Sequence, residues 1–133
     1  MSTADDSDWG PAHAAAARAI SALVDRAGEI ADTGGFPALV ESFAVAHPAW
    51  GAGAVELRLS ATPRLTPTGT EPTDARQLDV CVLSTSGGSE TKRALLRGST
   101  SEIVAAMQSL AVPRDVVRLM RELAATQRRF ELP

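Results

Sequence analysis

The sequence predicts an α+β domain with the element order α-α-β-β-β-α-α, in which a three-stranded antiparallel meander carries helices packed on one face. Apolar residues recur at helical spacing in the first and last thirds of the 133-residue chain. Between these regions, apolar and polar residues alternate, as they do in strands with one solvated face. Glycine and proline residues separate the two kinds of pattern.

The chain divides into a tail and one domain. Residues 1–10 are polar and acidic and are expected to be mobile, with Trp9 as an anchor onto the first helix. The rest of the chain is long enough for a single hydrophobic core. Within this domain, residues 11–133, we expect a helical hairpin, a β-meander and a C-terminal helix pair, over residues 11–47, 54–97 and 99–129.

Two helices are predicted in the first third. Pro11 suits the first turn of a helix, and an apolar stripe continues to about Ala31, formed by Ile20, Leu23, Val24, Ala27 and Ile30. A shorter helix is expected to start at Pro37, with a stripe formed by Phe36, Leu39, Val40 and Phe43. His47-Pro48 ends this helix, because the residue before a proline avoids the α-helical region.

The middle of the chain has the alternation of β-strands. Polar residues separate the apolar ones in two segments, Val55, Leu57, Leu59 and Ala61, then Leu78, Val80 and Val82. The segment 63–75 between them is rich in Pro, Thr and Gly, and it predicts a long loop of the kind that is functional or disordered. A hairpin turn over residues 86–89 then leads to a third strand, which ends at Arg97.

A capping box marks the start of the last third. Ser99 and Glu102 have the spacing at which each side chain satisfies a backbone N–H group of the other. An apolar stripe follows, and Pro113 starts a second helix. Arginines line this last helix and are interpreted as a solvated face, as most charge runs are: Arg114, Arg118, Arg121, Arg128 and Arg129.

Composition narrows the class of protein. The net charge of −3 disfavours a general nucleic-acid binder. The N-terminus lacks a basic signal region, and no apolar run reaches the roughly 20 residues that span a bilayer, so we expect a cytoplasmic protein without membrane contact. The two histidines and the single cysteine are far apart in sequence, so no metal site and no cofactor are predicted. Cys81 is interpreted as a small buried hydrophobe within a strand.

One residue is a candidate for catalysis. His47 lies beside Trp50 and before the flexible segment Gly51-Ala52-Gly53. Imidazole titrates near neutral pH and can act as a general acid or base. The alternative is that His47 caps the end of its helix and donates to the last carbonyl groups.

The junction between the third strand and the capped helix is a candidate anion site. It offers backbone N–H groups and hydroxyls at a helix N-terminus, and two arginines lie close by in sequence. Its members are Arg93, Arg97, Gly98, Ser99, Thr100 and Ser101. Strand alternation places Arg93, Leu95 and Arg97 on one face, so the two arginines can alternatively cover an outer sheet surface and pair with acidic neighbours.

These patterns favour a small non-enzymatic binding protein that acts through contacts with a protein or peptide partner, such as an adaptor, an accessory subunit or an immunity-type inhibitor. Two alternatives stay open. One is a biosynthetic tailoring enzyme that acts on a peptide or small metabolite through His47, and the other is an anion- or nucleotide-sensing domain that uses the Gly98–Glu102 junction. A homodimer is also predicted, through a continued sheet or through the helical hairpins, because a three-stranded sheet leaves two unpaired edges.

Overall fold

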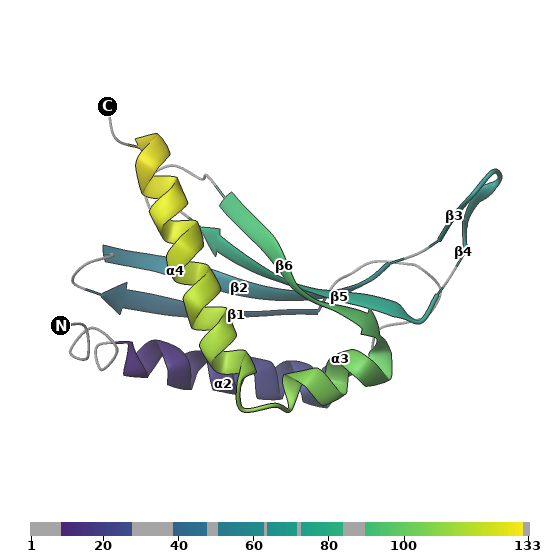
Figure 1. Cartoon of the computed structure of the whole chain (residues 1–133), viewed down its shortest axis with the longest axis horizontal. Helices are drawn as coiled ribbons and strands as arrows, with labels where there is room; N and C mark the ends of the chain where they lie inside the picture. Colours follow the sequence, from purple (N-terminus) through teal and green to yellow (C-terminus); the bar gives the residue numbers. More distant parts are fainter. Residues whose placement is uncertain are drawn as a thin grey trace.

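Three helices pack against an antiparallel sheet in the part of the chain that the computed structural model describes, residues 9–27, 39–47, 51–62, 64–71, 73–83 and 90–131 (Figure 1). The α+β class is therefore confirmed. The element order is α2 (Gly10–Arg26), β1 (Leu39–His47), β2 (Gly51–Ala61), β3 (Arg64–Thr66), β4 (Gly69–Glu71), β5 (Ala75–Leu83), β6 (Glu90–Ser99), α3 (Thr100–Met107) and α4 (Val112–Glu131).

The main sheet has four strands in the order β1-β2-β5-β6, so the predicted three-stranded meander is wrong in strand number. The strands β2, β5 and β6 are neighbours, and β1 is added along the free edge of β2. The β1–β2 register runs without interruption from Leu39 opposite Leu59 to His47 opposite Gly51. A separate two-stranded sheet is formed by β3 and β4.

The predicted helix that ends at His47 is also wrong, and with it the helical hairpin over 11–47. Leu39 and Phe43 are four residues apart, a spacing that fits one face of a helix and one face of a strand equally. In the structure Leu39 and Val45 are buried whereas Val40 is 42% exposed, which is the period of a strand. The pairing of this segment with β2 decides between a helix and a strand, and the local spacing of apolar residues does not reveal that pairing.

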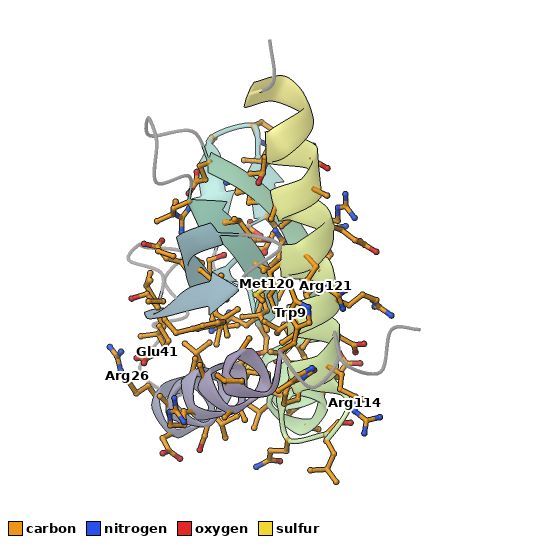
Figure 2. All side chains as sticks on the ribbon, turned by 90° about the vertical axis from the view of Figure 1, so that its left-hand side faces the viewer. Trp9, Arg26, Glu41, Arg114, Met120 and Arg121 are labelled. Atoms are coloured by element: carbon orange, nitrogen blue, oxygen red, sulfur yellow. The ribbon has the colours of Figure 1, made fainter. Side chains whose placement is uncertain are left out.

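One face of the sheet is buried beneath the helices. Alternate residues of β2 and β5 form its centre, namely Val55, Leu57, Leu59, Leu78, Val80 and Val82. Helix α2 packs on β1 and on α4, and α4 packs on β5 and β6. This packing places α2 beside the first half of α4, although the two helices are far apart in the chain (Figure 2).

The predicted loop over 63–75 contains a hairpin, β3–β4, that projects from the body of the molecule (Figure 1). Arg64 and Glu71 pair across it, with 3.1 Å between Arg64 Nε and a Glu71 carboxylate oxygen. Leu65 on this hairpin is 82% exposed. The sequence predicted a loop and missed these two strands. Both faces of the hairpin are solvated, so no apolar alternation marks its strands.

Both edges of the main sheet carry protective features. The register of β6 shifts at a bulge, and its exposed side chains include Lys92, Arg93 and Arg97. At the other edge, α2 contacts β1. Bulges, charges and covering helices are common ways to prevent edge pairing. The homodimer stays a prediction, and the sheet edges give it little support.

Some predicted features lie outside the described residues. These are residues 1–8 of the tail predicted over residues 1–10, the helix end near Ala31, the helix start at Pro37 and the turn over residues 86–89. Gly10, at the end of that predicted tail, instead begins α2.

Candidate functional site: a basic groove between two helices

The junction before α3 is occupied by groups of the protein itself. The capping box is confirmed, because Ser99 Oγ accepts from the Glu102 N–H at 3.2 Å and the Ser99 N–H donates to a Glu102 carboxylate oxygen at 2.9 Å. This backbone hydrogen bond, with a further one from the Ser99 side chain, lowers the pKa of Glu102. The Thr100 hydroxyl donates to the Asp74 carboxylate at 2.6 Å. Two carboxylates therefore already accept hydrogen bonds where an external anion would bind.

Arg93 and Arg97 face opposite sides of the sheet, so the predicted alternation is wrong. The β5–β6 register shifts between Leu78 and Asp79, which leaves Leu95 as an extra residue in β6. A bulge of one residue moves every later side chain to the other face. Local alternation cannot show such a shift, because it depends on the partner strand.

Each of these arginines has a partner within the protein. Arg93 lies 3.3 Å from a Glu122 carboxylate oxygen on α4, and Arg97 Nε donates to Gln77 Oε1 at 3.0 Å. The two arginines still border one open recess of about 400 Å³ along β6. The residues Gly98–Ser101 do not line this recess. Anion binding at the junction stays a prediction.

His47 is the last residue of β1, where its backbone pairs with Gly51, so it does not end a helix. Its side chain lies outside the described part of the structure. The predicted catalytic role of His47 stays untested.

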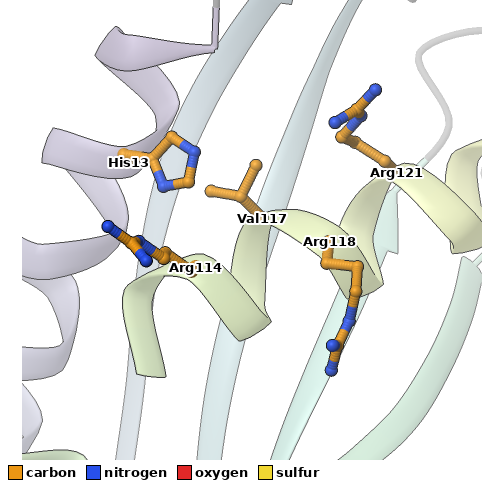
Figure 3. A pocket seen from close by; sticks show the side chains of 5 residues that line it. All are labelled: His13, Arg114, Val117, Arg118 and Arg121. Carbon is orange, nitrogen blue, oxygen red and sulfur yellow. The ribbon is translucent and has the colours of Figure 1, made fainter. Parts of the chain in front are cut away.

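A different set of basic residues meets between α2 and α4. His13 of α2 and Arg114, Arg118 and Arg121 of α4 line, together with Val117, a pocket of about 420 Å³ (Figure 3). We call this pocket the basic groove. In Figure 3, His13 projects toward α4 beside Arg114, and Arg118 and Arg121 lie on the other side of Val117.

The helical period places the three arginines on one side of α4. Positions 114, 118 and 121 are separated by four and three residues, and side chains at these separations are neighbours on a helix surface. Val117 lies within the same stripe and is buried. Its burial turns the stripe toward α2, which brings the arginines to the seam between the two helices.

Trp9 supports one end of the basic groove. Its ring is 4% exposed, and the guanidinium carbon of Arg121 lies 4.9 Å from the ring centroid. A cation over the face of a tryptophan is attracted by the ring quadrupole. Trp9 is buried in the core, and the contact of its ring with Arg121 positions that arginine; the predicted anchoring of the tail onto the first helix stays a prediction.

The charges of the other two arginines, Arg114 and Arg118, are not neutralised by a strong ion pair within the described part of the chain. Arg118 lies 3.4 Å from a carboxylate oxygen of Asp115, but its side chain is 68% exposed, so this ion pair is weak. Arg114 has no carboxylate partner among the described residues. It lies in the first turn of α4, where the helix dipole adds partial positive charge. The groove is thus a positive region on an acidic protein.

This arrangement suits the binding of an anion. Guanidinium groups bind carboxylates and phosphates through paired hydrogen bonds. None of the five side chains that line the groove is a hydroxyl, thiol or carboxylate. The sequence led us to interpret both the arginines and His13 as solvated surface residues, because no local signal places α2 beside α4.

Cys81 is buried on the sheet, as predicted. Burial raises the pKa of its thiol to about 11, against a smaller opposite effect of the Arg58 charge. Reactive cysteines instead have a lowered pKa and access to solvent.

We therefore expect iodoacetamide at pH 8 to label Cys81 in the native protein on the order of a hundredfold more slowly than in urea, because the reactive thiolate is scarce and buried. Mass spectrometry of timed samples measures both rates. Rapid labelling under native conditions would contradict the buried position.

The described helices include none with the length and apolar character required to cross a membrane. Among all the residues that the structure describes, no group of His, Cys, Asp or Glu side chains is arranged to hold a metal ion. No protein-family model matches the chain, and no curated protein or solved structure shows significant similarity to it. Function is therefore inferred from the geometry of the site.

Proposed function

We propose that this chain is a non-enzymatic binding protein whose basic groove holds an acidic segment of a partner protein. The observation that carries the proposal is that three arginines and a histidine line one pocket in a chain of net charge −3. Grouped like charges repel one another, and a bound anion offsets that repulsion. A ligand with several negative charges therefore fits this surface.

The length of the groove favours a peptide over a single phosphate group. Arg114 and Arg121 are seven residues apart, which corresponds to about 10 Å along a helix. One phosphate group reaches one or two guanidinium groups, whereas carboxylates spread along a peptide reach all three arginines. Contacts with Asp or Glu side chains of a partner would also agree with the protein-binding role expected from the sequence.

The first test selects ligands without assuming the partner. A random peptide library displayed on phage is selected against the full chain, and we expect enrichment of sequences with several Asp or Glu residues. A synthetic fluorescent copy of an enriched peptide then gives a dissociation constant by fluorescence anisotropy. Its affinity should fall as salt rises, because the attraction is between solvent-exposed charges.

The double variant Arg114→Glu, Arg118→Glu should weaken binding of this peptide by at least about tenfold, since a hydrogen bond to a charged group contributes roughly 1.5–3 kcal/mol. Arg64→Glu is the matched control, because Arg64 is 71% exposed on the distant β3–β4 hairpin. An unchanged affinity of the groove variant, or enrichment of basic peptides, would contradict the proposal. Tripolyphosphate is titrated in parallel, and binding of this probe without binding of acidic peptides would replace the proposal with the anion-sensing alternative.

A further inference from the structure

We infer that the partner's acidic segment also carries a large apolar side chain, which enters a second recess at the end of the basic groove. This inference rests on the proposed function and identifies the chemistry of the partner more closely. The second recess, here called the apolar crevice, has a volume of about 360 Å³ and lies between α2 and the turn that joins α3 to α4.

The floor of the apolar crevice is hydrophobic. Ile20 of α2 and Met107 of α3 are each 3% exposed, and Val24 and Pro113 form half-buried walls. Ligand pockets with high affinity are usually apolar with a few polar groups at the rim. A Leu, Ile, Met or Phe side chain would bury apolar surface here, whereas the basic groove has no comparable apolar floor.

The crevice and the groove lie along the same seam. On α2, Ala17 in the crevice follows His13 in the groove by one helical turn, so the two residues share a face. On α4, Pro113 in the crevice directly precedes Arg114 in the groove. Helices α2 and α4, which line the groove together, are in contact with each other. One partner segment can therefore occupy both.

Leu110 extends the apolar area at the mouth of the crevice. It is 92% exposed and lies in the turn between α3 and α4. An exposed leucine by itself is common, but one that borders an apolar recess enlarges a contiguous patch, and such patches mark interaction sites.

Charge sets the direction of the bound segment. Asp25 lines the crevice on α2 near Val24, while the arginines lie beyond its other end. Acidic residues of the partner are attracted toward Arg114 and repelled from Asp25. The apolar side chain should therefore be flanked by acidic residues on one side only. The occupant that fits this asymmetry is a segment of a partner protein with acidic residues on one side of a large apolar residue.

The test uses the peptides selected on the full chain. We expect them to contain a large apolar residue with Asp or Glu residues on one side of it. Replacing that apolar residue by serine in the synthetic peptide should weaken its binding to the native chain by about tenfold, as expected for loss of one buried apolar side chain.

A double-mutant cycle assigns this loss to the crevice. Ala17→Phe fills the crevice from the exposed side of α2, and we expect the apolar and serine peptides to bind this variant within about twofold of each other. Leu110→Ser provides the same comparison if Ala17→Phe fails to fold, as judged by circular dichroism. Leu65→Ser is the matched control, because it removes an exposed leucine from the distant β3–β4 hairpin.

The outcomes separate the two proposals. If the apolar residue matters equally in the native chain and in both crevice variants, or if the enriched peptides are acidic without an apolar residue, the crevice inference is overturned while the groove proposal stands. If Arg114→Glu, Arg118→Glu also leaves affinity unchanged, or if no peptide is enriched, both are overturned. A dimer in sedimentation velocity that Leu110→Ser dissociates would show that a second copy occupies the crevice, which also overturns the inference.

Discussion

Replacing Trp9 by alanine is expected to lower the free energy of unfolding by about 3–5 kcal/mol, the range for removal of a buried large aromatic side chain. The ring is 4% exposed and belongs to the main hydrophobic core. It also lies at the N-cap position of α2 and beneath Arg121 of α4, so it joins the two helices (Figure 2). Urea unfolding followed by circular dichroism measures the change, with an unchanged m-value expected.

The same substitution should weaken binding of the selected acidic peptide, because Arg121 loses the ring that positions it. Trp9→Phe is the conservative comparison. It keeps an aromatic face for the guanidinium group, so we expect it to recover most of the affinity while a smaller loss of stability remains. A native-like stability of Trp9→Ala would contradict the role of Trp9 in the core.

Met120→Ala is expected to cost about 2–5 kcal/mol of unfolding free energy. Met120 is fully buried on α4, and Figure 2 shows it on the side of the helix that faces the core. Helix α4 packs on β5 and β6, so a cavity at Met120 removes contacts that hold the helix on the sheet. The shift of the urea midpoint measures this loss.

The two alanine variants form a matched pair. Met120 does not line the basic groove, so Met120→Ala should retain affinity for the acidic peptide under conditions in which it is folded. Met120→Leu should cost less than about 1.5 kcal/mol, because the side-chain volume is nearly conserved. Equal loss of peptide affinity in Met120→Ala and Trp9→Ala would show that the binding defect reflects general destabilisation, and it would contradict the specific support of Arg121 by Trp9.

Local signals in the sequence were sufficient for several elements. The stripe after Pro11 predicted a helix, and α2 spans Gly10–Arg26. Alternation around Leu57 and Val80 predicted the strands β2 and β5, which form the centre of the sheet. The spacing of Ser99 and Glu102 predicted the capping box before α3. In each case, the structure of the segment is specified by interactions between residues close in sequence or by a repeated pattern of apolar residues.

The candidate site was less accessible to sequence reasoning. The three arginines of the basic groove were visible as a helical stripe, but charge runs on helices are usually solvated. Their significance depends on His13 and Trp9, which are about a hundred residues away in the chain and adjoin the groove only because α2 packs on α4. At the predicted anion junction, likewise, the contact between Asp74 and Thr100 joins distant segments and has no local signal, and anion binding there stays a prediction.

Short-range periodicity and capping specify the α+β class, the first and last helices, the central strands and the capped start of α3, so the amino-acid pattern alone was enough to predict them. Three other features depend on contacts between segments that are distant in the chain. Residues Leu39–His47 became a strand because they pair with β2, and the bulge at Leu95 separated Arg93 from Arg97 because the register of β6 is set by β5. The basic groove formed because two helices distant in sequence share one core, and no local pattern encodes which charges that packing brings together.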